Sequence, residues 1–214
     1  MKWRTRTLRA YGRWAVGNGP DYKTLRNSLA PQYVKNHNAL LLFLRLVNMV
    51  PEIDMSRYQY NVMHAVFAYA VVIMYHEHRD QLDNIFTLYN VSPDDVSKPY
   101  IKSVSYRQAG KSTIMILICM AFFMSVPLHV GWNFEQCWVS FNLDVVKRAL
   151  TLMKSRMRLI DDFYELFSFD DKESKETHRN GEKKLRMRRK DDPDECYREV
   201  ELMAVSKHDL AAAT

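Results

Sequence analysis

Residues 100–126, YIKSVSYRQAGKSTIMILICMAFFMSV, carry the clearest fold signal in this chain. Residues 100–106 are a candidate strand, and a short polar turn follows them. A helix is then predicted to begin at Lys111, and its apolar run over residues 114–126 stops before Pro127, a residue that cannot continue a helix. The stretch therefore predicts a strand, a tight turn and a buried helix in direct succession.

The turn between this strand and helix has the spacing of a phosphate-binding loop. Residues 105–113, SYRQAGKST, match the pattern GxxxxGK[ST] except that Ser105 replaces the first glycine. In such a loop, backbone N–H groups face the phosphates, and Gly110 permits an approach that a side chain would block. Lys111 would reach the β- and γ-phosphates, and the Ser112 hydroxyl would bind Mg²⁺. The turn predicts an ATP·Mg²⁺ site, the alternative being a surface turn capped by Ser112.

A second strand and helix follow the first pair along the chain. Residues 137–141, CWVSF, are the strand candidate, and Asn142 leads into an amphipathic helix over residues 144–161. The apolar residues near helical spacing in this helix are Val145, Ala149, Leu152, Met153 and Leu159. The order strand, helix, strand, helix is typical of a parallel sheet with crossover helices. The expected fold class is α/β, a partial P-loop NTPase core of parallel strands and crossover helices over residues 51–166.

The N-terminal region is basic and helical. The first fifty residues contain nine Lys or Arg and a single acid, Asp21, so residues 1–50 form either a polyanion-binding arm or a merely solvated one. Helices are predicted over residues 39–50 and 57–79.

Two apolar runs raise the question of a membrane protein. Residues 62–75 and 114–126 are each shorter than the roughly 18 to 20 residues that cross a hydrocarbon core, so both predict buried core helices and no membrane is expected. The three cysteines form no CxxC pair, which favours neither a zinc site nor a disulfide framework and suits a reducing compartment.

The composition changes abruptly after residue 167. Ten acids and ten bases lie between Asp170 and Glu199, so residues 167–214 are expected to be a disordered charged tail that buries no core. Residues 183–190, KKLRMRRK, could be a nuclear localisation signal or a nucleic-acid patch, or simply part of a solvated tail.

The phosphate-binding turn resembles that of one family, the ATPase of viral terminase large subunits from tailed-phage and herpesvirus-type packaging motors. Their deviant Walker A loop carries an arginine early and commonly lacks the first glycine, so Ser105 conforms to it. The resemblance makes Arg107 and Lys111 the catalytic candidates, with Arg107 as a cis-acting arginine on the γ-phosphate. It implies a nucleotide-binding set of Arg107, Gln108, Ala109, Gly110, Lys111, Ser112 and Thr113, with Ser112 as the metal ligand.

Flanking residues extend the resemblance to about residues 55–165. Tyr58 and Gln59, at the start of a predicted helix, resemble the adenine-reading Q motif, in which glutamine offers a paired donor and acceptor and tyrosine a stacking face. The strand at residues 137–141 and the helix after it resemble the element that follows the P-loop helix in terminases.

The sequence departs from the family where a Walker B strand should end in Asp-Glu. The nearest candidate, residues 158–162 (RLIDD), fits a helix end better. One explanation for the missing Walker B strand is an upstream exon that is read past its splice site, so that part of an ATPase is followed by an unrelated tail. The other is a complete small protein that binds nucleotide and turns it over poorly.

The resemblance implies ATP hydrolysis that drives viral DNA into capsids. Its implied partners are viral DNA, the portal and a small terminase subunit, with a homo-oligomer left open, in the host nucleus or cytoplasm and preferably the nucleus. Three alternatives are a different P-loop nucleotide binder, a membrane-associated helical protein, and a helical module whose Arg107 and Lys111 contact DNA phosphate.

Overall fold

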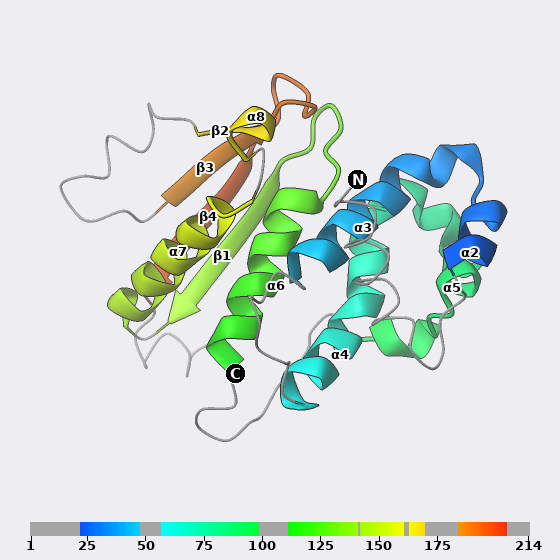
Figure 1. Cartoon of the computed structure of the whole chain (residues 1–214), viewed down its shortest axis with the longest axis horizontal. Coiled ribbons are helices and arrows are strands. Elements are labelled where there is room, and N and C mark those ends of the chain that lie inside the picture. The colour runs from blue at the N-terminus through cyan, green and yellow to red at the C-terminus, as the bar shows by residue number, and fades with distance from the viewer. Residues whose placement is uncertain are drawn as a thin grey trace. The chain divides into compact units, whose positions relative to one another are not determined.

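The computed structural model describes residues 22–47, 57–98, 111–140, 142–160, 163–169 and 184–204. The chain divides into two compact units, Met1–Pro127 and Leu128–Thr214. The first unit is helical, and the second combines a four-stranded sheet with helices (Figure 1). The predicted mixed α/β class is confirmed at this coarse level. The boundary between the units falls inside the stretch, residues 51–166, that the sequence assigned to a single core.

The helical unit is built from five α-helices among its described residues. Short 3-10 turns at Pro31–Tyr33, His76–Gln81 and Pro93–Val96 connect or follow them. The predicted helices at residues 39–50 and 57–79 are present where they are described. The first begins earlier, at Val34, and the second ends at Met74 because Tyr75 has non-helical backbone angles. The α-helices are α2 (Tyr22–Ser28), α3 (Val34–Val47), α4 (Arg57–Met74), α5 (Leu82–Tyr89) and α6 (Lys111–Ser125).

The apolar helix α6 organises the core of this unit. Most of its side chains from Ile114 onward are buried, as a helix that is apolar on nearly every side requires. Helices α3 and α4 pack against it, and the rings of Phe43 and Phe122 lie 4.5 Å apart between centroids. Both apolar runs of the sequence are therefore buried helices, as predicted. Within the described ranges, no helix combines the length and apolarity needed to cross a membrane.

A buried polar network joins α3 to α4 and α5. The Nδ1 atom of His37 lies 2.8 Å from the Tyr89 hydroxyl, which lies 2.7 Å from the Tyr75 hydroxyl. The Asn36 side-chain amide donates to the Met74 carbonyl oxygen at 2.7 Å. Burial lowers the pKa of His37 to about 4 and raises the pKa of Tyr75 above its ordinary value. The imidazole of His37 is therefore neutral in the folded chain at pH 7.

The pKa of His37 predicts that the folded chain loses stability as the pH falls from about 6.5 toward about 4. In this window the unfolded chain binds a proton at His37 that the folded chain does not, so acidification favours unfolding. At about 1.4 kcal/mol per pKa unit, the loss is roughly 3 kcal/mol. His37→Gln, which keeps a hydrogen-bonding partner for Tyr89 but does not titrate, should flatten this dependence.

Urea titrations between pH 7 and pH 4, followed through amide hydrogen exchange in α3, measure the effect. His64→Gln is the matched control, since His64 is exposed on α4. An unchanged slope in the His37 variant would show that this imidazole does not carry the acid sensitivity.

The second unit contains a mixed sheet with the strand order β1-β4-β3-β2. Strands β1 and β4 are parallel, whereas β3 is antiparallel to both β4 and β2. The strand predicted at residues 137–141 is confirmed as β1, but its parallel partner is β4, and the sheet is mixed where parallel strands alone were predicted. The elements are β1 (Phe134–Ser140), α7 (Leu143–Met157), α8 (Phe163–Leu166), β2 (Phe167–Phe169), β3 (Lys184–Arg189) and β4 (Arg198–Ala204).

Helix α7 covers part of this sheet (Figure 1). The Asn142 side chain caps it by accepting from the Asp144 backbone N–H at 2.9 Å. The helix packs along β1 and β4 and buries one stripe of side chains, but this is not the predicted stripe. Of the predicted apolar residues, Met153 is buried, whereas Val145, Leu152 and Leu159 are exposed. The buried stripe is Val146, Leu150, Met153 and Met157.

The charged segment after residue 167 does not behave as a disordered tail over residues 184–189 and 198–204. Leu185 and Met187 in β3, and Val200 and Leu202 in β4, are buried at alternate positions and give the sheet an apolar face. The expectation was wrong here because the segment's mean composition hides this two-residue alternation.

Charges on the opposite face of β3 and β4 are paired. Glu199 accepts from the Lys184 ammonium at 3.1 Å and from the Arg186 guanidinium at 2.8 Å. Arg186 also lies 4.0 Å above the ring centroid of Tyr197. Burial alone would raise the pKa of Glu199, but the hydrogen bonds from Arg186 and Lys184 outweigh it and hold that pKa below its ordinary value.

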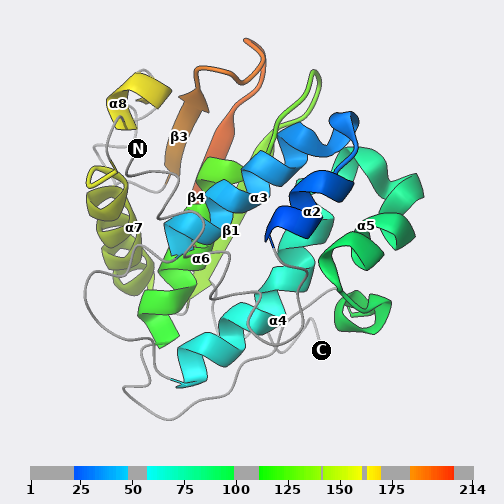
Figure 2. The same cartoon turned by 45° about the vertical axis from the view of Figure 1, so that its right-hand side comes forward.

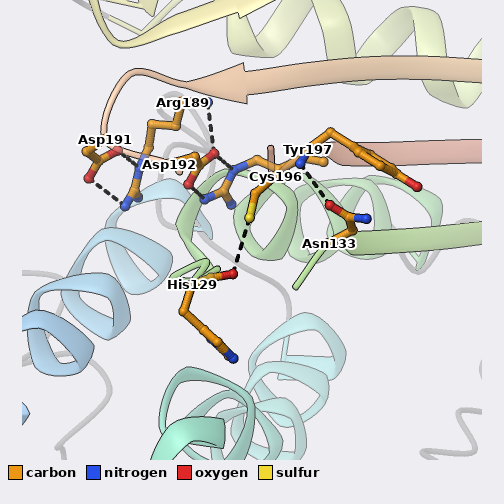
Figure 3. Close-up of polar contacts among 8 residues, drawn as sticks. His129, Asn133, Arg189, Asp191, Asp192, Cys196 and Tyr197 are labelled. Atoms are coloured by element: carbon orange, nitrogen blue, oxygen red, sulfur yellow. Dashed lines mark hydrogen bonds and ion pairs between the residues drawn. The ribbon is translucent and has the colours of Figure 1, made fainter. Parts of the chain in front are cut away.

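A fully buried ion pair closes the turn between β3 and β4 (Figure 3). The side chains of Arg198 and Asp192 are 0% and 1% exposed. Asp192 accepts from Arg198 Nε at 2.7 Å, from Arg198 Nη2 at 2.5 Å and from the Arg189 backbone N–H at 2.9 Å. Both carboxylate oxygens are therefore satisfied, which is the condition under which a buried pair can be tolerated.

A second set of bonds ties the start of β4 to the segment before β1. The Cys196 thiol donates to the His129 carbonyl oxygen at 3.2 Å, and the Tyr197 N–H donates to Asn133 Oδ1 at 3.1 Å (Figure 3). These bonds and the buried pair fix where β4 begins.

Breaking the buried pair should destabilise the sheet strongly. Asp192→Asn leaves the Arg198 charge buried without its counter-ion, which typically costs about 3–5 kcal/mol. The double variant Asp192→Leu/Arg198→Met, which removes both charges, should recover most of that loss. Urea unfolding with hydrogen exchange at β4 measures both.

Asp194→Asn is the matched control, because Asp194 is exposed on the same turn. A loss of less than about 1 kcal/mol for Asp192→Asn would contradict a structural role for the pair.

Candidate functional site

Helix α6 begins at the lysine of the GKS sequence. Lys111 is its first residue, and the side chains of Lys111, Ser112 and Thr113 are exposed, whereas Ile114 is fully buried. Exposure thus changes to burial within one turn. The first backbone N–H groups of a helix have no partner within it, and the helix dipole makes this end attractive to an anion. The exposed end of α6 has the groups that a phosphate site requires.

Most of the predicted loop lies outside the described residues. Arg107, Gln108, Ala109 and Gly110 fall in this part of the chain, as does the strand predicted at residues 100–106. The described residues therefore bear on the helical end of the motif, Lys111, Ser112 and Thr113, and on its surroundings.

The start of α4 lies next to the start of α6. The two helices are in contact, and in both Figure 1 and Figure 2 they begin at the same end of the helical unit, side by side. Tyr58 and Gln59, the predicted adenine-reading residues, belong to the first turn of α4, and their side chains are half-buried. Residues about fifty positions apart in the sequence are thus brought to one end of the unit.

These two helix ends offer complementary chemistry. Lys111 supplies a positive charge, Ser112 and Thr113 supply hydroxyl oxygens, and the α6 terminus supplies N–H donors. Gln59 supplies an amide with donor and acceptor, and Tyr58 supplies an aromatic face. Among the described residues of this end, Ser112 is the candidate ligand for Mg²⁺.

The remaining predicted elements lie in the second unit. Strand β1 and helix α7 follow α6 along the chain in the predicted order. The weak Walker B candidate at residues 158–162 is no strand where it is described, because Arg158 is the C-cap of α7 and a turn follows it. A complete P-loop core is therefore not present in the described residues.

The basic run at residues 183–190 forms strand β3 over Lys184–Arg189, and the bases of this strand have partners. Lys184 pairs with Glu199 and Glu201, Arg186 pairs with Glu199, and Arg189 pairs with Asp191. The Arg188 guanidinium donates to the Asp194 carbonyl oxygen. With these charges engaged inside the unit, the geometry favours a structural role for the run over a nucleic-acid patch.

One surface feature had no counterpart in the sequence-based expectations. The outer side of α7 borders an open hollow of about 480 Å³. The sequence predicted an amphipathic helix here, but it placed the exposed Val145, Leu152 and Leu159 in one stripe with the buried Met153. The hollow is bordered, where the chain is described, by Asp144, Lys147, Arg148, Thr151, Leu152 and Ser155.

Compared with known proteins, the chain matches no family model, no curated protein and no solved structure. The candidate site at the α4 and α6 ends therefore rests on the residues and geometry of the chain itself.

Proposed function

We propose that this chain binds ATP·Mg²⁺ at the exposed end of α6 and is the ATP-binding part of a terminase-type DNA-packaging ATPase. The observation that carries the proposal is the position of Lys111. The lysine of the GKS sequence is the exposed first residue of α6, and α4, whose first turn contains Tyr58 and Gln59, begins at the same end of the unit (Figure 1, Figure 2).

The phosphate half of the proposed site uses the start of α6. The first N–H groups of this helix and the Lys111 ammonium would bind the β- and γ-phosphates, and the Ser112 hydroxyl would be a ligand for Mg²⁺. The burial of α6 from Ile114 onward supports this role, because a helix held along its length keeps its end fixed in space.

The base half of the proposed site uses the start of α4. Gln59 would pair with the adenine edge through its amide, and Tyr58 would stack on the ring. The adjacency of the two helix starts supports this assignment, since base and phosphates belong to one ligand molecule.

The resemblance to terminases is the basis for proposing ATP hydrolysis and DNA transport. Arg107 would offset the negative charge that develops on the γ-phosphate during transfer. Hydrolysis by the proposed set alone should be slow, since the set contains no carboxylate to activate water. Viral DNA, the portal and a small terminase subunit are the proposed partners, within an infected cell.

The first test is calorimetric titration of the full chain with ATP in the presence of Mg²⁺. Wild type should bind with Kd between about 1 μM and about 1 mM. Lys111→Ala should weaken binding roughly ten- to a hundredfold, because hydrogen bonds to charged groups contribute about 1.5–3 kcal/mol. Lys23→Ala, at an exposed lysine of α2, is the matched control.

A folded wild-type chain that binds no ATP would contradict the proposal. Equal binding by wild type and Lys111→Ala would do the same. Salt-sensitive DNA binding that Lys111→Ala weakens, with no response to ATP, would instead assign the lysine to DNA phosphate.

The second test separates the base from the phosphates. Gln59→Ala should reduce the preference for ATP over GTP by about tenfold, since the lost adenine contacts contribute about 0.5–1.5 kcal/mol each. Lys111→Ala should weaken both nucleotides equally, because they share the triphosphate. Competition titrations give the two Kd values, and Gln32→Ala, exposed in the first 3-10 turn, is the control. An unchanged ATP:GTP ratio in Gln59→Ala would remove Gln59 from the site.

A further inference from the structure

The outer side of α7 carries an exposed apolar seam. Val145 is 57% exposed, Leu152 is 39% exposed and Leu159, just after the helix, is 64% exposed. Val145 and Leu152 are seven positions apart, two helical turns, so they lie in a row along α7, and Leu159 continues this spacing in the turn that follows the helix. The fold of this unit does not use them, because α7 packs on the sheet through its other side.

Two basic side chains flank this seam. Arg148 lies three residues after Val145 and four before Leu152, and Arg156 lies four residues after Leu152 and three before Leu159. From Leu143 to Arg158 the sequence contains one acid, Asp144. The hollow of about 480 Å³ lies on the same side, and Leu152 from the seam and Arg148 both border it. The bases of this stretch are Lys147, Arg148, Lys154, Arg156 and Arg158.

We propose that the outer side of α7 binds an acidic amphipathic helix of a partner protein. Apolar residues of that helix, repeating every seven positions, would pack on Val145, Leu152 and Leu159. Its Glu and Asp residues would face the flanking bases, as charged residues beside the seam of a coiled coil do.

The apolar seam and its flanking bases together favour an acidic helix over a nucleic acid and over a lipid surface. A nucleic-acid backbone would pair with the bases but would leave a row of exposed Leu and Val uncovered. An anionic lipid surface binds helices through a wide apolar face. The wide apolar face of α7 already packs on the sheet. An acidic helix satisfies the charge and the apolar seam together, and its straight axis matches the seven-residue spacing.

The test uses the full chain and a fluorescent 21-residue peptide with Leu at the a and d positions of three heptads and Glu at the flanking positions. Anisotropy titrations compare wild type with Leu152→Ser/Leu159→Ser and with Arg148→Glu. The serine pair should weaken binding at least about tenfold through lost apolar contact, and Arg148→Glu should weaken it by a similar factor. Arg26→Glu, at an exposed arginine of α2, should leave binding within about twofold of wild type.

A second peptide of the same composition, scrambled so that it has no heptad pattern, measures how much of the binding depends on that pattern. It should bind at least about tenfold more weakly than the first. Equal binding of the two peptides, or no effect of the serine pair, would overturn the proposal. Hydrogen exchange in β4 should be the same in all variants, which shows that a lost interaction is not lost folding.

Two further titrations decide between occupants. Binding of a 21-base-pair DNA duplex that Arg148→Glu abolishes and the serine pair leaves intact, with no binding of the peptide, would assign the surface to nucleic acid. Binding of phosphatidylserine vesicles that depends on Leu152 and Leu159, again without peptide binding, would assign it to a membrane. Either result would overturn the protein-helix proposal.

Discussion

The apolar surface of α6 is the constraint on which the helical unit depends. A helix with apolar side chains on nearly all sides must be enclosed, and α3 and α4 enclose it. The polar residues at the start of α6, Lys111, Ser112 and Thr113, remain exposed to water. The requirement to bury α6 therefore also determines which of its ends is available to a ligand. A candidate phosphate site at this end has a rigid, packed element behind it.

The second unit is under a different constraint, because its strands contain many charged residues and must still bury an apolar face. Alternation places Leu185, Met187, Val200 and Leu202 on one face, so the charged residues between them can pair on the other. Arg198 falls on the apolar face, and its charge is tolerated because the turn supplies Asp192. Burial of Arg198 therefore depends on the turn between β3 and β4, because that turn carries Asp192.

The elements that the sequence predicted well are those determined by local pattern. Long apolar runs identified α4 and α6 because burial of such runs depends little on their partners, and Asn142 marked the start of α7 by its capping chemistry. The strands β3 and β4 were missed because high charge outweighed a short two-residue alternation. The mixed pairing of the sheet depends on contacts between segments far apart in the sequence, which no local pattern contains. At the site, the start of α6 at Lys111 was predicted from the motif, whereas the adjacency of Tyr58 and Gln59 followed only from the resemblance.

The two proposed binding surfaces differ in the physics that each requires, so evidence for one says nothing for or against the other. The α6 end is small and polar, and its binding would depend on N–H groups and one lysine, which favours a compact anion held at a fixed point. The α7 seam is long and mixed, and its exposed leucines would be of no use to a phosphate. They share no residue and lie in different units, so a substitution at Lys111 should leave the seam intact and a substitution at Leu152 should leave nucleotide binding intact. Coupling between them would require a conformational change that both ligands favour, and only a nucleotide-dependent change in peptide affinity would demonstrate it.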